Sequence, residues 1–190
     1  FHFTGHLDSE GREPLRIDRI WVVGDRFGLI SHFGDRSDKP IEMFDRNIRA
    51  FGSAVQNTLS NLTVGIVGCG GTGSAVAEQL VRLGVRKFVL LDPDVLSTSN
   101  LTRVIGSVAA DVGRRKVDVT ADHLEAIALD AQCDRVASML TVNHAARRLL
   151  GCDVVFGCSD DNAGRLILSR LCTYLLTPVI DCGVLLSSDS

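Results

Sequence analysis

The stretch TVGIVGCGGTGSAVAEQLVRLG (63–84) constrains the fold of this chain more than any other segment. It begins with an apolar run typical of a buried strand and continues through a glycine-rich loop. It ends in a segment whose apolar residues recur at helical spacing. This order is that of a strand–loop–helix unit in an α/β protein. We therefore predict a strand at 63–68 and a helix at 74–84 that stops at Gly84.

Short apolar runs and helical segments keep alternating after this unit. The runs rich in Val, Ile and Leu predict strands at 87–92, 133–140, 152–160 and 178–186, and the helical segments lie at 111–128, 144–150 and 162–176. Such strands, separated by helices, form a parallel sheet covered on both faces. The predicted fold class is α/β, Rossmann-like, with a mainly parallel sheet, helices on both faces and an N-terminal extension.

The first 42 residues differ in composition, being richer in Gly, Asp and Arg, with one strand predicted at 16–24. We treat residues 1–42 as an N-terminal segment that can be the tail of a preceding domain. Apolar residues at helical intervals predict one helix over 40–61. Since the chain begins with Phe1 and stops at Ser190 after an apolar run, we expect a fragment whose second domain, 43–190, is incomplete at its C-terminus.

Composition narrows the class of protein. The net charge is −3, which gives no support for general binding to nucleic acids or membrane surfaces. No segment approaches the roughly 18 unbroken apolar residues of a membrane span. The six cysteines form no CxxC pair and mostly sit in apolar runs. They are typical of reduced, buried thiols, so we expect a cytoplasmic protein without a disulfide framework or zinc site.

The glycine loop and the next strand predict a nucleotide site. Gly68, Gly70 and Gly73 form a GxGxxG pattern between a strand and a helix, where the backbone can approach a phosphate at the helix N-terminus. The alternative is a mere tight turn. Asp92 follows 19 residues after Gly73, at the end of the second strand, where a carboxylate can accept hydrogen bonds from both ribose hydroxyls. Its alternative is a helix cap or a surface acid. A nicotinamide enzyme fits these residues equally well.

Further polar residues on the same predicted edge favour a ligand with more phosphate charge, and ATP is the natural candidate. Arg and Lys suit phosphate oxygens, and an acid at a strand end suits Mg²⁺ beside a triphosphate. The residues in question are Asp94, Asn100, Arg103, Lys116 and Asp160. Each has a structural alternative: 114–116 as a solvated helix face, Asp160 or Asp161 as a helix cap, and Asn100 serving only its turn.

The order of these motifs resembles the ThiF/MoeB and ubiquitin-activating-enzyme adenylyltransferase family. The family pattern GxGGxGS, Asp-x-Asp, SNLxR, VGxxKV and C[ST]D appears here as GCGGTGS, DPD, SNLTR, VGRRKV and CSD. Upstream, MFDRNIRAFG (43–52) is similar to the family's RYxRQ segment, although Met43, Phe44 and Asn47 depart from it. The resemblance covers about residues 43–186.

The resemblance implies roles for individual residues. The residues implied to bind the nucleotide are Gly68, Gly70, Gly71, Gly73, Asp92, Asp94, Asn100, Arg103 and Lys116. The implied catalytic residues are Arg46, Arg103, Lys116 and Asp160, of which Asp160 would hold Mg²⁺. Arg46 resembles an arginine that crosses from a second subunit to the γ-phosphate, which implies a homodimer.

The function implied is ATP-dependent adenylation of the C-terminal carboxylate of a ubiquitin-like or sulfur-carrier protein, with release of pyrophosphate. Three alternatives stay open at this point. One is ATP-driven cyclisation of a tRNA base by a related family member, against which the acidic balance argues mildly. The second is an NAD-dependent oxidoreductase, and the third is a non-catalytic nucleotide-binding scaffold.

Overall fold

The computed structural model describes residues 2–3, 19–22, 28–31, 42–127 and 130–183. The chain divides into two compact units, Phe1–Ile41 and Glu42–Ser190. The first unit holds an antiparallel sheet of β1 (His2–Phe3), β2 (Arg19–Val22) and β3 (Gly28–Ser31), in that order. The strand predicted at 16–24 is present as β2, while its flanks at 16–18 and 23–24 lie outside the described residues.

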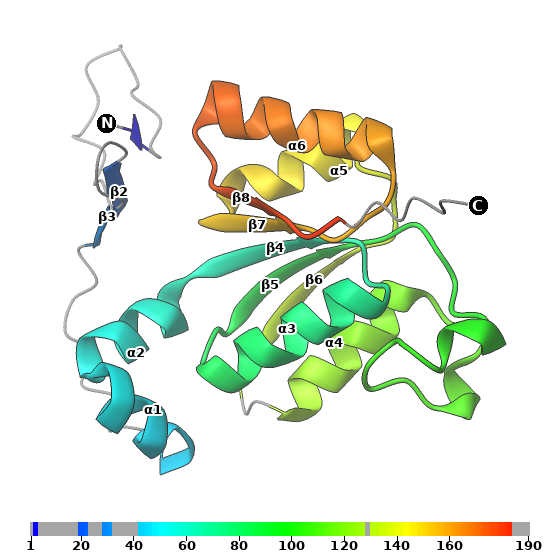
Figure 1. Cartoon of the computed structure of the whole chain (residues 1–190), viewed down its shortest axis with the longest axis horizontal. Coiled ribbons are helices and arrows are strands. Elements are labelled where there is room, and N and C mark those ends of the chain that lie inside the picture. The colour runs from blue at the N-terminus through cyan, green and yellow to red at the C-terminus, as the bar shows by residue number, and fades with distance from the viewer. Residues whose placement is uncertain (1, 4–18, 23–27, 32–41, 128–129, 184–190) are drawn as a thin grey trace, which may run out of the picture. The chain divides into compact units, whose positions relative to one another are not determined.

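The second unit is built on a five-stranded parallel sheet in the order β6-β5-β4-β7-β8 (Figure 1). Its strands are β4 (Thr63–Val67), β5 (Lys87–Leu91), β6 (Gln132–Val136), β7 (Val154–Gly157) and β8 (Val179–Asp181). The chain adds β5 and β6 on one side of β4, then returns to add β7 and β8 on the other. This reversal is the switch point of a doubly wound sheet, and it confirms the predicted Rossmann-like fold class.

Helices cover both faces of this sheet (Figure 1). On one face lie α3 (Gly71–Leu83) and α4 (Lys116–Ile127), and on the other lie α5 (Asn143–Arg148) and α6 (Asn162–Leu175). Short 3₁₀ helices occur at Thr98–Asn100, Ala109–Asp111 and Leu149–Gly151. No described helix is long and apolar enough to cross a membrane.

Alternation along β4 explains why the core has two layers. Val64 and Ile66 are fully buried against α3 and α4, whereas Val67 packs in the opposite layer with residues of α5 and α6. Successive strand residues point to opposite faces, so a strand that is apolar throughout needs helices on both sides. Gly65 faces the second layer, where a Cβ would lie 2.9 Å from the Leu149 side chain.

The single helix predicted over 40–61 is wrong, because the segment breaks at Gly52. The structure has a 3₁₀ turn at Glu42–Phe44, then α1 (Asp45–Phe51) and α2 (Ser53–Asn61). Gly52 adopts φ +86°, a left-handed conformation that glycine accepts readily and that ends the helical path. By contrast, the predicted stop at Gly84 is confirmed, with φ +108° at the C-terminus of α3.

The prediction over 111–128 also needs correction, because α4 begins only at Lys116. The preceding residues instead form a 3₁₀ turn and a loop with Gly113 at φ +95°. That loop pairs with residues after β5 through an isolated bridge between Val95 and Arg115. Lys116 is therefore the first residue of a helix, not a position within one.

The later strands are shorter than predicted. β6 ends at Val136 instead of residue 140, and β7 ends at Gly157, so Asp160 lies in the loop beyond the strand. β8 ends at Asp181, although the prediction extended this strand to residue 186. The part of that prediction from residue 184 onward lies outside the described residues. The helix predicted near 144–150 is divided into α5 and a 3₁₀ turn.

Candidate functional site

A cavity of about 520 Å³ opens at the carboxyl ends of the parallel strands. Loops that follow all five strands line it, which is where doubly wound sheets bind their ligands. Its size is within the range of pockets for small molecules. The predicted site residues that line it are Gly68, Gly70, Gly71, Asp92, Asp94, Arg103, Lys116 and Asp160. Three predicted residues, Gly73, Asn100 and Arg46, are not in the lining.

The glycines of the loop are required for different physical reasons. Gly70 precedes the first turn of α3, and a Cβ added there would meet nothing within 4 Å, so this position faces the open cavity. Gly73 is buried in the turn, where a Cβ would lie 1.7 Å from the carbonyl oxygen of Gly68. Gly68 itself adopts φ +93°. Gly73 therefore shapes the loop, while Gly70 leaves room for a ligand at the N-terminus of α3.

Asp92 lies at the floor of the cavity and is buried. Its Oδ2 accepts a hydrogen bond from the Cys69 amide at 2.7 Å, and its Oδ1 accepts one from the Asp94 amide at 2.8 Å. Burial raises the pKa of Asp92, and the two amides and Lys116 oppose that rise. Each carboxylate oxygen has a second lone-pair site, so Asp92 can accept further hydrogen bonds from a ligand.

Lys116 is held at the cavity by Asp94. The ammonium Nζ lies 2.7 Å from Asp94 Oδ2, and the Lys116 amide donates to the Asp94 carbonyl at 3.0 Å. The lysine side chain is 12% exposed and the aspartate side chain 62% exposed. The buried stem fixes the direction of the lysine, and the solvated acid leaves the ammonium available to an incoming anion.

Arg103 crosses over the start of α3. A Cβ on Gly71 would lie 3.3 Å from the Cβ and Cγ of Arg103, so the absence of a side chain at Gly71 lets the arginine pass. The guanidinium Nη1 donates to the Ser99 carbonyl at 3.2 Å, on the same loop. Arg103 thus presents a charged group at the cavity from a fixed stem.

Asn100 is buried behind the cavity wall, where its Oδ1 accepts a hydrogen bond from the Ser97 amide at 3.1 Å. This contact closes the 3₁₀ turn at Thr98–Asn100, which is the turn role that the sequence left open as an alternative. Contact between Asn100 and a phosphate stays a prediction.

The loop that carries Asp94 and Arg103 is anchored by Ser74, whose role the sequence did not reveal. The buried Ser74 hydroxyl accepts a hydrogen bond from the Ile105 amide at 2.9 Å and donates to the Gly71 carbonyl at 3.2 Å. A small apolar cluster of Leu96, Val104 and Val119 packs under the same loop. The serine in GCGGTGS was the one available signal for this anchor.

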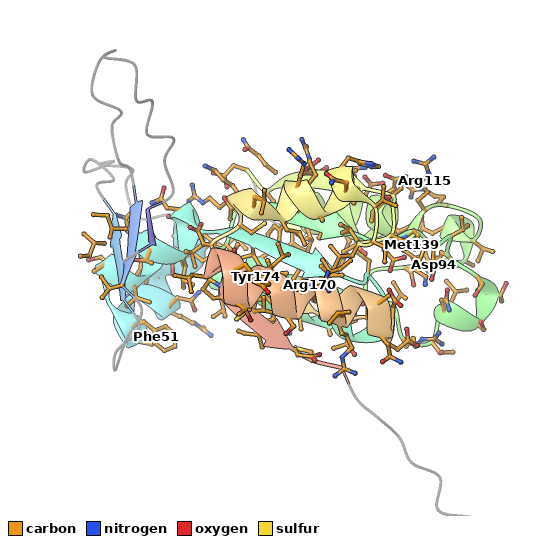
Figure 2. All side chains as sticks on the ribbon, turned by 90° about the horizontal axis from the view of Figure 1, so that it is seen from above. Phe51, Asp94, Arg115, Met139, Arg170 and Tyr174 are labelled. Carbon is orange, nitrogen blue, oxygen red and sulfur yellow. The ribbon has the colours of Figure 1, made fainter. Side chains whose placement is uncertain are left out.

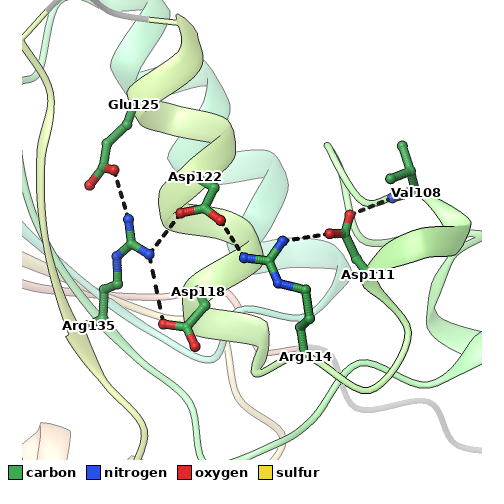
Figure 3. Close-up of polar contacts among 7 residues, drawn as sticks. All are labelled: Val108, Asp111, Arg114, Asp118, Asp122, Glu125 and Arg135. Carbon is green, nitrogen blue, oxygen red and sulfur yellow. Dashed lines mark hydrogen bonds and ion pairs between the residues drawn. The ribbon is translucent and has the colours of Figure 1, made fainter.

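The basic run Arg114–Lys116 divides between two tasks. Arg114 binds Asp111 and Asp122, and Arg135 binds Asp118, Asp122 and Glu125, in a network along α4 (Figure 3). Hydrogen bonds from the Val108 amide and Arg114 lower the pKa of Asp111, and those from Arg114 and Arg135 lower the pKa of Asp122. Arg114 thus fastens the loop before α4 to that helix, and Arg135 fastens β6 to it. Of the run Arg114–Lys116, only Lys116 lines the cavity.

Two neighbouring acids have different surroundings in the structure. Asp161 caps α6, since its carboxylate oxygens accept hydrogen bonds from the Ala163 and Gly164 amides at 3.1 and 2.9 Å. Asp160 is exposed in the cavity lining. Within the described ranges no three His, Cys, Asp or Glu residues gather to hold a metal. One free carboxylate fits Mg²⁺, which usually takes one or two protein carboxylates and completes its shell with phosphates and water.

Several lining residues were not among the predicted site residues, and four of them are of chemical interest. Met139 and Leu140 follow β6 and form an apolar part of the wall, and Cys158 and Cys182 follow β7 and β8. Burial, and then the neighbouring Cys182, raise the pKa of Cys158 to about 12. These residue types are common in cores, so their spacing gave no signal that they meet at one cavity.

Arg46 lies far from the cavity of its own chain. Its helix α1 is beside the C-terminus of α3, where the Asn47 side-chain amide donates to the Arg82 carbonyl at 3.4 Å. Gln56 of the following helix α2 donates its side-chain amide to the Leu83 carbonyl at 3.1 Å. The cavity lies at the other end of the 13-residue helix α3, a length of about 20 Å. Figure 2 shows the same separation, with Phe51 of α1 at the opposite end from Asp94 and Met139.

Comparison with known proteins identifies relatives of this chain. A family model described as the ThiF family matches residues 44–188. The tRNA threonylcarbamoyladenosine dehydratase of Bacillus subtilis (strain 168) is 31% identical over 143 residues, which are 74% of this chain and 56% of the relative. The adenylyltransferase and sulfurtransferase MOCS3 of Bos taurus is 33% identical over 179 residues, which are 93% of this chain and 38% of the relative.

Among solved structures, the E. coli tRNA N6-threonylcarbamoyladenosine dehydratase TcdA in complex with ATP matches with a TM-score of 0.69 and 25% identity. The match covers 73% of this chain and 58% of that chain. The chain therefore spans less than two thirds of the length of each of these relatives.

Proposed function

Because the chain belongs to the ThiF family, we propose that it binds ATP with Mg²⁺ at the carboxyl edge of the sheet and adenylates a carboxylate. The single observation that carries this proposal is the convergence of Lys116, Arg103 and Asp160 on the cavity beside the glycine loop. A triphosphate needs this combination of cations and a metal ligand. The ATP complex of TcdA supports ATP over NAD as the nucleotide.

The cavity suggests how ATP is bound. The glycine loop and the N-terminus of α3 receive phosphate oxygens, and Gly70 leaves the backbone open to them. Asp92 accepts hydrogen bonds from the ribose hydroxyls, through the lone pairs that its two contacts with backbone amides leave free. Met139 and Leu140 supply an apolar surface on which the base can rest.

Adenylation then needs positioning and charge neutralisation more than acid–base chemistry. The acceptor carboxylate is already ionised at neutral pH, so it can attack the α-phosphorus without a general base. Pyrophosphate leaves, and Lys116 and Arg103 stabilise the negative charge that develops on it. Mg²⁺ held by Asp160 would neutralise phosphate charge when bound. Asp94 contributes by fixing the Lys116 ammonium.

The acceptor proposed is the C-terminal carboxylate of a ubiquitin-like or sulfur-carrier protein. The MOCS3 relative, named as an adenylyltransferase and sulfurtransferase, supports this acceptor. A second candidate is a modified tRNA base, which the similarity to the Bacillus subtilis and E. coli dehydratases supports. Both candidates share ATP activation at the same cavity. Incubation of the protein with α-labelled ATP and either glycine-terminated carrier proteins or tRNA would distinguish them by which one becomes labelled or modified.

The first test of the metal assignment uses two adjacent acids. We expect Asp160→Asn to lower ATP–pyrophosphate exchange by about 10²-fold or more, measured with a carrier protein that supports exchange. The reason is that Mg²⁺, which would neutralise phosphate charge, loses its protein ligand. Asp161→Asn is the matched control, since asparagine caps a helix as well as aspartate does. Exchange at the wild-type rate in Asp160→Asn would contradict the assignment of Mg²⁺ to this residue.

The ribose assignment is tested at Asp92. We expect Asp92→Asn to bind ATP about 10- to 100-fold more weakly, because hydrogen bonds to a charged carboxylate contribute about 1.5–3 kcal/mol each. Calorimetry with ATP and with 2′,3′-dideoxy-ATP measures the cause directly. The wild type should prefer ATP, and the variant should bind both alike. A variant that keeps the wild-type preference would show that the hydroxyls are held elsewhere.

We also propose that the active form is a homodimer in which Arg46 of each subunit completes the site of the other. Two observations support this assembly. Arg46 is separated from the cavity of its own chain by about the length of α3. Near Arg46 in the sequence, Met43, Phe51 and Val55 are 46%, 58% and 45% exposed to solvent. Large apolar side chains clustered at a surface commonly mark an interface. A second copy would cover them and bring Arg46 to the phosphates.

A further inference from the structure

Two cysteines lie side by side at the edge of the sheet. β7 and β8 are parallel neighbours whose last paired residues are Gly157 and Asp181, and Cys158 and Cys182 come directly after them. The Cys182 amide donates to the Gly157 carbonyl at 2.8 Å, so the two strands are still in register at this point.

Both cysteines are free thiols and both line the nucleotide cavity. Neighbouring strands are about 4.8 Å apart, and a disulfide joins residues whose Cα atoms are about 4.4–6.8 Å apart. Residues at matching positions of adjacent strands therefore fall within bridging distance. Both residues line the same cavity, and the Cys182 side chain is close enough to that of Cys158 to raise its pKa. The exposed Cys172 on α6 is not among the residues that line this cavity.

We propose that Cys158 and Cys182 form a reversible disulfide across the wall of the nucleotide cavity when the protein meets a low-molecular-weight disulfide such as oxidised glutathione. The pair is a site of thiol modification distinct from the phosphate-binding residues. Neither the glycine loop nor the loop with Lys116 contributes a sulfur to it.

The reaction is a thiol–disulfide exchange in two steps. The Cys182 thiolate attacks one sulfur of the small disulfide, whose S–S bond breaks and releases one small thiol. The Cys158 thiolate then attacks the Cys182 sulfur of the mixed disulfide, and the second small thiol leaves. The protons of the two cysteine thiols pass to the two released thiolates. Two protein thiols are oxidised and one small disulfide is reduced, so atoms and electrons balance.

The backbone around Cys158 connects this site to the nucleotide. A Cβ on Gly68 would lie 3.0 Å from the carbonyl carbon and oxygen of Cys158, so the glycine loop packs directly on this residue. A disulfide that draws Cys158 toward β8 would disturb that packing and occupy part of the cavity. This coupling rests on the proposed function. By linkage, if ATP opposes the disulfide, the disulfide weakens ATP binding by the same factor.

The experiment treats the whole chain with oxidised glutathione, with and without ATP·Mg²⁺, and maps disulfides by mass spectrometry after tryptic digestion. The tryptic peptide with Cys158 also carries Cys152, and the peptide with Cys182 also carries Cys172, so fragment ions must assign the link. The variants are Cys158→Ser and Cys182→Ser, with Cys172→Ser as the matched control.

We expect one intramolecular link between Cys158 and Cys182, lost in either partner variant, kept in Cys172→Ser, and formed several-fold more slowly with ATP·Mg²⁺. Mixed glutathione adducts without a link, or a link that persists in Cys182→Ser, would overturn the proposed pair. A link whose rate ignores ATP, although calorimetry shows that ATP binds, would overturn the coupling. If calorimetry shows no ATP binding while the link forms, the proposed function fails and the thiol pair stands.

Discussion

A chain carrying Arg46→Ala is expected to lose about 10³- to 10⁵-fold in ATP–pyrophosphate exchange, the range found when an arginine supplied in trans is removed from a phosphoryl-transfer site. ATP affinity should change much less, because the role proposed for Arg46 is to stabilise the charge that develops during the reaction, with no contact to the nucleoside. Since Arg46 is exposed on α1, the variant should fold normally. Exchange and calorimetry on the same preparation separate the two effects.

The decisive version of this experiment mixes two inactive chains. In a dimer of one Arg46→Ala subunit and one Asp160→Asn subunit, one site has both defects and the other site has neither. Random pairing should therefore restore about a quarter of the wild-type rate if Arg46 acts across a two-fold interface. If Arg46 acted within its own chain, both sites of the mixed dimer would be defective and no activity would return. Arg49→Ala, one turn along α1, is the matched control, since its salt bridge with Asp45 is exposed.

Gly73→Ala is expected to abolish measurable ATP binding and to lower the melting temperature. The new Cβ would lie 1.7 Å from the carbonyl oxygen of Gly68. The Cβ is bonded directly to the backbone and the oxygen is a backbone atom, so no side-chain rotation can separate them. Relief requires the loop or the start of α3 to move, and overpacking of this kind commonly costs about 1–3 kcal/mol and sometimes more. Thermal melting and calorimetry measure the two consequences.

Gly70→Ala in the same loop is the matched comparison. Its Cβ would meet no atom within 4 Å, and the residue has an extended conformation with φ −78° that alanine accepts. This variant should melt like the wild type yet bind ATP more weakly, because the methyl group enters the space proposed for phosphate. Equal ATP affinity in Gly70→Ala and wild type would contradict the placement of phosphate at this turn.

Much of the fold was predictable because its determinants are local. The glycine loop, the apolar run of β4 and the helix stop at Gly84 lie close together in the sequence, and backbone conformation at these positions depends mainly on neighbouring residues. Helix limits were less predictable where a glycine interrupts an apolar pattern. Gly52 divides α1 from α2, and Gly113 belongs to the loop that delays α4. Periodicity continues through such residues although the helix does not.

The candidate site was predictable to the extent that the strand-end rule gathers loops at one edge. That rule placed Asp92, Lys116 and Asp160 together, and the structure brings all three to one cavity. The rule does not say which side chain of a loop faces inward. Asn100 closes its own turn, and of two adjacent acids Asp161 takes the cap while Asp160 faces the cavity.

The sequence by itself determined the strand–loop–helix unit, the parallel sheet and the edge at which charged residues gather. Only the tertiary structure decided that Arg46 lies a helix length from its own cavity, that Ser74 anchors Ile105, and that Cys158 and Cys182 are neighbours. The physical reason is range. Propensity and periodicity act over a few residues, whereas these contacts join segments whose closeness follows from packing of the whole unit.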